Sequence, residues 1–294
     1  MTEPLLTPDF LRRLDRLELE TRRVLGGQLK GERRSKRKGI GLDFADHRHY
    51  SRGDDPRHLD WNIYARLEKL FIKVFHEEQD LQCHLLLDAS KSMEFGDPNK
   101  LLFAKRLAAA IAYVGLRRQD RISLTCFNEA TGERFGPARG RPNIRRLLTF
   151  LDKLEAGGET SLFNACRECA QRVSTRAVVI VVSDLLDPAG FDAALRQLVR
   201  QSLDVFVIHV LAPQEIEPDL RGHLELHDVE TDQRIEVTAN ERLLKIYRKH
   251  LDTLCSAAQA FCLRRGMQYM LVRTDTPIED LVLMRLRSAG LMKG

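Results

Sequence analysis

The sequence has 294 residues, of which 43% are hydrophobic and 30% are charged, as is typical of a globular protein that buries its own core. These proportions exclude collagen-like, low-complexity and wholly disordered chains. The 47 basic and 42 acidic residues leave a net charge of +5, which does not by itself indicate nucleic-acid binding.

The sequence shows neither a membrane span nor a secretory signal. Its longest uncharged apolar run, Leu107 to Leu116, is shorter than the roughly 20 residues that a membrane helix needs. The first residues lack a basic segment followed by an apolar one. The six cysteines do not indicate a disulfide framework. We therefore expect a cytoplasmic protein with reduced thiols.

Residues 1–38 predict an amphipathic helix followed by a basic arm. A Thr-Pro-Asp sequence at Thr7 is a helix start. Apolar residues at spacings of three and four then extend the expected helix to about Leu25. Residues 30–38 contain six basic side chains and no apolar side chain to bury. We therefore expect this segment to be an exposed arm.

Residues 39–82 predict a small β-rich region. Apolar residues are spread among many polar ones, and Leu70 to Phe75 has the composition of a strand.

Residues 83–294 predict a doubly wound α/β domain with a mostly parallel sheet. Strands that are apolar on both faces alternate with helices, which is typical of a parallel sheet covered on both sides. Helix starts are expected at Asp97-Pro98 and Asp187-Pro188, and a capping box at Thr238 and Glu241. An inserted β-hairpin is expected at about 222–238. The expected strands are 84–88, 121–127, 177–182, 205–211 and 268–272.

Oxygen-bearing side chains follow several of these strands, where doubly wound folds place their ligand sites. Asp88 is the last residue of the first buried strand, Ser90 and Ser92 follow it, and Asp184 lies at the end of the most apolar strand. Thr160 follows a Gly-Gly pair in the intervening loop. Carboxylates and hydroxyls are hard donors that suit Mg²⁺ or Mn²⁺ better than zinc. An Asp followed by serines is also compatible with a simple turn that caps a helix.

The order of these groups resembles the metal-ion-dependent adhesion site of von Willebrand factor A domains. Asp88, Ser90, Ser92, Thr160 and Asp184 each match a ligand position of that motif. The resemblance implies an ion that keeps one coordination position open for a carboxylate of a partner. It also implies a binding protein rather than an enzyme.

The segment before the domain is similar to the signature of the bacterial domain-of-unknown-function 58 family, whose members join it to a von Willebrand A-like domain. The similarity covers roughly residues 39–290. It implies a MoxR-type AAA+ ATPase or a client protein as partner, in a chaperone-like system that matures other proteins. The matching residues are Gly39 to Phe44, Arg48, Tyr50, Gly53 to Arg57, Asp60, Trp61, Ala65 and Arg66.

Two other functions remain open from the sequence. Asp88 could be the nucleophile of a metal-dependent phosphatase, although Ser90 stands where such enzymes need a second acid. The basic arm 30–38 could bind nucleic acid, although no aromatic residue is interleaved with it. Zinc binding by His47, His49 and His58 is disfavoured because no fourth ligand lies at a useful spacing.

Overall fold

The structure is a computed structural model, and it divides into two compact units. One unit comprises residues 1–26 and 81–294, and the other comprises residues 27–80. Most of the basic arm lies outside the described residues. The structure describes residues 4–20, 38–39, 43–51, 56–76, 81–128, 132–173, 177–187, 189–199, 203–220, 222–227 and 234–293.

A mostly parallel sheet forms the centre of the larger unit. Within the described residues it has six strands in the order β12–β9–β8–β5–β6–β7, and only β7 runs antiparallel to its neighbour. The expected doubly wound α/β architecture is therefore confirmed. The strands are β5 (Gln82–Asp88), β6 (Arg121–Phe127), β7 (Arg134–Ala138), β8 (Ala177–Ser183), β9 (Leu203–Leu211) and β12 (Gln268–Arg273).

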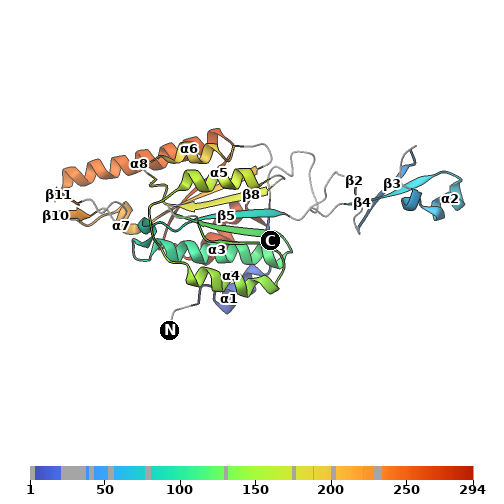
Figure 1. The fold of residues 1–294 in the computed structure, drawn as a ribbon, viewed down its shortest axis with the longest axis horizontal. Helices are drawn as coiled ribbons and strands as arrows, with labels where there is room; N and C mark the ends of the chain where they lie inside the picture. The colour runs from blue at the N-terminus through green and yellow to red at the C-terminus, as the bar shows by residue number, and fades with distance from the viewer. Residues whose placement is uncertain are drawn as a thin grey trace. The chain divides into compact units, whose positions relative to one another are not determined.

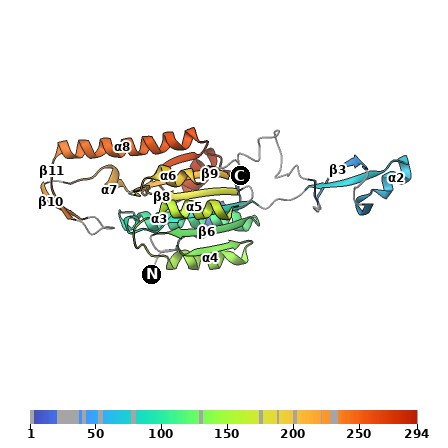
Figure 2. The same ribbon diagram turned by 45° about the horizontal axis from the view of Figure 1, so that its top comes forward.

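Helices cover both faces of this sheet (Figures 1 and 2). The strands are apolar on both faces because alternate residues pack against opposite helix layers. In β8, for example, Ile180 belongs to the core on one face and Val181 to the core on the other. One face carries α1 (Pro8–Leu14), α3 (Lys100–Arg117) and α4 (Pro142–Lys153), and the other carries α5 (Leu162–Arg172), α6 (Phe191–Arg196) and α8 (Glu241–Arg264).

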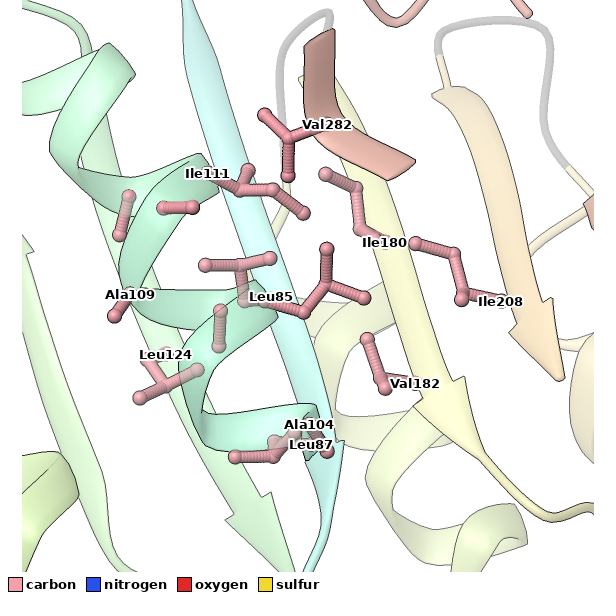
Figure 3. Packing of buried hydrophobic residues seen from close by; sticks show 14 of the residues in the cluster. Leu85, Leu87, Ala104, Ala109, Ile111, Leu124, Ile180, Val182, Ile208 and Val282 are labelled. Carbon is pink, nitrogen blue, oxygen red and sulfur yellow. The ribbon is translucent and has the colours of Figure 1, made fainter. Parts of the chain in front are cut away.

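Helix α3 is the central element of the first layer. Its Ala-rich face allows close approach to the sheet, and residues Leu107 to Ala112 are fully buried. Figure 3 shows Ile111 and Val282 lying against Leu85 and Ile180. This packing fixes β5 and β8 under one helix, which in turn fixes the edge where both strands end. Val282 belongs to a C-terminal helical segment made of α9 (Ile278–Asp280), η4 (Leu281–Arg285) and α10 (Leu286–Ser288).

The N-terminal helix is shorter than predicted. Helix α1 ends at Leu14, and β1 (Glu18–Leu19) then pairs antiparallel with β13 (Met292–Lys293). The apolar residues Leu17 and Leu19 are buried in the core of the larger unit. The turn and strand after α1 therefore bury the apolar side chains that predicted a longer helix. Part of the predicted range, residues 21–25, lies outside the described residues.

Three predicted helix starts are displaced. Helix α3 begins at Lys100, where the side chain of Asn99 caps the Leu102 N–H at 2.9 Å. Helix α6 begins at Phe191 after Gly190. The predicted capping box before α8 is wrong because Thr238 lies in a strand, and Asn240 is the cap. For α3 and α8, an asparagine nearer to the helix than the predicted cap accepts a free backbone N–H at the helix start.

Strand β7 was not expected because its sequence, Arg-Phe-Gly-Pro-Ala, contains both glycine and proline. It lies at the end of the strand order, as an edge strand. Proline is tolerated there because an edge strand leaves some N–H groups unpaired.

The predicted hairpin is present as β10 (Gly222–His227) and β11 (Arg234–Ala239). It leads into α8, whose N-terminal half extends away from the sheet beside the hairpin (Figure 1). Only Ala258, Phe261 and Cys262 of α8 are buried, and all three lie in its C-terminal half. A short helix, α7 (Pro213–Ile216), precedes the hairpin.

The smaller unit contains an antiparallel sheet in the order β2–β4–β3. The predicted β-rich region therefore holds a sheet, and it also contains a helix whose N-cap is Asp60. None of the helices that the structure describes is sufficiently long and apolar to span a membrane. The elements of this unit are β2 (Lys38–Gly39), β3 (Asp43–His49), η2 (Pro56–His58), α2 (Trp61–Leu67) and β4 (Phe71–His76).

The buried N-terminal segment should contribute strongly to stability. Leu14→Ala removes a fully buried side chain, so we expect a loss of about 2–5 kcal/mol in the free energy of unfolding. The same substitution at Leu263, which is 59% exposed, should cost far less. Urea unfolding of both variants compares these losses. Equal losses would contradict integration of the N-terminal segment into the core.

Candidate metal site

Two carboxylates lie at the carboxyl edge of the sheet. Asp88 is the last residue of β5, and Asp184 directly follows β8. These strands pair in parallel, with Leu87 opposite Val182, so both chains leave the sheet at the same edge. Both aspartate residues are completely buried. Burial of two carboxylates requires compensating hydrogen bonds and charges.

Both oxygens of Asp88 accept hydrogen bonds. Oδ1 accepts from the backbone N–H of Ser90 at 3.0 Å and from Ser90 Oγ at 2.7 Å. Oδ2 accepts from Ser183 Oγ at 2.6 Å and from Thr160 Oγ1 at 3.3 Å. Groups from β8, from the segment after β5 and from the glycine loop thus meet at one side chain.

Ser92 connects this cluster to the second carboxylate. Its Oγ lies 3.0 Å from Ser90 Oγ, and it donates to Asp184 Oδ2 at 3.0 Å. Ser92 lies in the short helix η3 (Lys91–Glu94), shortly after β5. The structure therefore brings all five sequence-predicted residues, Asp88, Ser90, Ser92, Thr160 and Asp184, into one hydrogen-bond network.

Backbone contacts hold the glycine loop in place. The N–H of Gly157 donates to the carbonyl of the residue directly after β5 at 2.9 Å, and Gly158 O accepts from Lys91 N–H at 3.0 Å. Gly158 has a φ of +71°, a conformation that side chains disfavour. The loop thereby positions Thr160 beside Asp88.

The structure adds two charged residues, Lys100 and Glu215, that the sequence did not predict for this site. Lys100, the first residue of α3, is only 1% exposed. Its Nζ donates to Asp184 Oδ2 at 2.8 Å and to Glu215 Oε1 at 2.6 Å. A signal was available in the sequence, because a lysine at the N-terminus of a helix opposes the helix dipole and therefore needs a nearby anion. Ser183 was also missed, although it directly precedes Asp184.

Burial shapes the protonation of this site. Burial, followed by the negative charge of Asp184, raises the pKa of Asp88 to about 7, although hydrogen bonds from Ser183 and Ser90 favour the ionised form. Burial opposes the charged form of Lys100, but Asp184 and Glu215 outweigh it and raise its pKa above the ordinary value. Lys100 is therefore charged at neutral pH, whereas Asp88 lies near its titration point.

The donor set fits a hard divalent cation. Carboxylate and hydroxyl oxygens are the ligands that Mg²⁺ and Mn²⁺ prefer. When all groups are ionised, the three carboxylates of Asp88, Asp184 and Glu215 exceed the single ammonium of Lys100 by two charges. A divalent ion would balance that excess.

The histidines and cysteines that are candidate ligands or reactive groups lie in other elements of the structure. His47 Nε2 lies 2.8 Å from Asp60 Oδ2 in the smaller unit. Across the described parts of the chain, no three His, Cys, Asp or Glu side chains form a cluster that could hold a metal, so the candidate site depends on two carboxylates together with hydroxyl oxygens. Cys166 and Cys169 are buried in α5, and burial raises the pKa of both thiols, which disfavours the reactive thiolate.

The raised pKa of Asp88 predicts an unusual pH dependence of stability. Between the ordinary value of 3.8 and about 7, the folded protein keeps a proton that the unfolded chain has lost. Stability should therefore fall as pH rises through this window, by at most about 1.4 kcal/mol per pH unit. Asp88→Asn replaces the carboxylate with a neutral group and should remove this contribution.

Urea unfolding of both proteins in EDTA, at a series of pH values, measures the difference. The stability of Asp88→Asn relative to wild type should increase from pH 4 to pH 7, a window set by the pKa shift. Parallel pH profiles would contradict the shifted protonation of Asp88.

Several solved structures are similar to this chain at low sequence identity. BatB from Bacteroides thetaiotaomicron is 16% identical, with a TM-score of 0.42, over 71% of this chain and 98% of that one. An aerotolerance-related membrane protein from Bacteroides fragilis is 17% identical, with a TM-score of 0.43, over 71% and 99%. The SpRpn10 VWA domain is 9% identical, with a TM-score of 0.42, over 69% and 94%. These similarities support no conclusion about activity.

Sequence comparison gives stronger evidence about the family of this chain than the solved structures do. The uncharacterized protein Rv1480 of Mycobacterium tuberculosis is 28% identical over 230 residues, which cover 76% of this chain and 72% of that protein. The uncharacterized protein Mb1516 of Mycobacterium bovis matches to the same extent. Residues 46–254 match the family described as "Protein of unknown function DUF58". Since that match spans more than half of the sequence, the chain belongs to the DUF58 family.

Proposed function

We propose that this chain is a non-enzymatic interaction protein that binds one Mg²⁺ or Mn²⁺ through Asp88, Ser90, Ser92, Thr160 and Asp184. The observation that supports this most strongly is the continuous network of buried oxygens, in which three carboxyl groups are accompanied by one lysine. A bound ion would supply an electrophilic position that accepts a carboxylate from a partner.

The proposed partner is a MoxR-type AAA+ ATPase or a client protein, in the cytoplasm. This proposal rests on membership of the DUF58 family and on the association of that family with such ATPases. In this role the chain is an adaptor in the chaperone-like maturation of other proteins. The divalent ion would make the contact with the partner dependent on Mg²⁺.

The contacts of Asp88 support binding over phosphatase chemistry. Both of its carboxylate oxygens accept hydrogen bonds, and the residue has no exposed surface. A nucleophilic carboxylate needs an oxygen that can reach a phosphorus atom. The hydroxyl of Ser90, where a second acid would be required, is itself bonded to Asp88. Nucleic-acid binding through the arm 30–38 remains the second alternative.

The metal site is tested by titrating Mn²⁺ into the protein and following binding by electron paramagnetic resonance and calorimetry. Wild type should bind one ion weakly, because only two of the proposed ligands are carboxylates and the others are neutral hydroxyls. Asp88→Asn keeps the shape of the side chain but removes a charge, and it should abolish binding. Asp187→Asn is the matched control, since Asp187 follows Asp184 closely in sequence but accepts the Leu162 N–H instead. Equal binding by both variants would contradict the proposed site.

The adaptor role is tested by capture of the MoxR-type ATPase encoded by the same genome. Wild type and Asp187→Asn should retain the ATPase in Mg²⁺ and lose it in EDTA, whereas Asp88→Asn should fail to retain it in both conditions. Capture that is insensitive to EDTA and to Asp88→Asn would remove the metal-dependent mechanism. Hydrolysis of small phosphoesters by wild type, lost in Asp88→Asn, would instead favour the phosphatase alternative.

A further inference from the structure

The candidate site already contains a cation of the chain itself. Lys100 is 1% exposed, and its ammonium lies 2.8 Å from Asp184 Oδ2. The same oxygen accepts the hydroxyl of Ser92 at 3.0 Å. The other oxygen of Asp184 accepts the backbone N–H of Leu186 at 3.2 Å. Both oxygens of Asp184 thus accept hydrogen bonds from protein donors, one of which carries a positive charge.

Glu215 shares the same ammonium from a different element. Its Oε1 lies 2.6 Å from Lys100 Nζ, and its Oε2 accepts the backbone N–H of Ala212 at 2.7 Å. This second contact fixes the carboxylate at the start of α7. The backbone carbonyl of Glu215 also accepts the hydroxyl of Tyr247 in α8 at 2.8 Å. Lys100 therefore divides its charge between the candidate site and α7.

We propose that Lys100 is an internal counter-cation that competes with the divalent ion for Asp184, and that Glu215 sets the affinity of the site by drawing Lys100 away. Both are positioning residues that act through Asp184. The inference rests on the proposed metal site and adds its regulation. A movement of α7 that breaks the contact between Glu215 and Lys100 would therefore weaken metal binding.

The physical basis is repulsion between like charges within a buried site. An ammonium in contact with Asp184 neutralises part of the charge that would attract Mg²⁺, and burial weakens screening of the repulsion between the two cations. When Glu215 balances Lys100, that repulsion is reduced. A purely structural ion pair would affect folding stability but would not couple Glu215 to metal affinity through Lys100.

The test is a double-mutant cycle in Mn²⁺ affinity with Lys100→Met, Glu215→Gln and the double variant. Lys100→Met should tighten binding by at least about tenfold because the competing charge is gone. Glu215→Gln should weaken binding several-fold in the wild-type background and have little effect beside Lys100→Met. Lys100→Met alone leaves carboxylates without their buried cation, which is destabilising. The double variant removes one positive and one negative charge, so it can still be tested if Lys100→Met does not fold.

The matched control is Lys105→Met, on the same helix. It removes the same charge, but from a lysine whose charge interactions involve Asp152, Cys126 and Glu155 rather than the site, and it should leave Mn²⁺ affinity within about twofold. Equal tightening by both lysine variants would reduce the effect to net charge and overturn the inference.

The remaining outcomes separate the inference from the proposed function. Unchanged affinity in Lys100→Met and in the double variant, with normal binding by wild type, overturns the inference alone. If Glu215→Gln weakens Mn²⁺ binding equally in wild type and in Lys100→Met, Glu215 acts directly on the ion through its charge. That result also overturns the inference. Binding by Lys100→Met but not by wild type supports a site that Lys100 keeps closed. Absence of Mn²⁺ binding in every protein overturns the metal site and the inference together.

Discussion

The parallel pairing of β5 with β8 is the constraint on which the rest of the site depends. It aligns Gln82 with Ala177 and Leu87 with Val182, so Asp88 and Asp184 emerge at one edge of the sheet. The pairing is held by helix layers on both faces, with Leu85 in one core and Leu86 in the other. A shift of one residue in register would exchange these faces and separate the two carboxylates.

Burial of those carboxylates then dictates their surroundings. Hydroxyls of Ser90, Ser183 and Thr160 satisfy Asp88, and Ser92 and Lys100 satisfy Asp184. Such a network is costly when a partner is missing, because a buried charge without compensation destabilises the fold. The same oxygens form a donor set for a divalent ion, so the arrangement that stabilises this edge also supports the proposed function.

The charged residues also connect this edge to the most extended part of the larger unit. Glu215 contacts Lys100 through its side chain and Tyr247 through its backbone. Tyr247 lies in the N-terminal half of α8, beside the β10–β11 hairpin (Figure 1). A partner that contacts this half of α8 would therefore act on an element that is hydrogen-bonded to Glu215, which in turn contacts Lys100.

The sequence by itself determined the α/β class, the strands from β5 to β12 with the exception of β7, and the five oxygen-bearing residues. Local composition carries this information, because fully apolar strands and the residues that follow them can be recognised without knowing their neighbours. Only the tertiary structure decided the shortened α1, the edge strand β7, and the places of Lys100 and Glu215. The last two are 115 residues apart in sequence, and neither has a local pattern that indicates the other. Their pairing depends on the return of α7 to the start of α3, which long-range packing of the sheet determines.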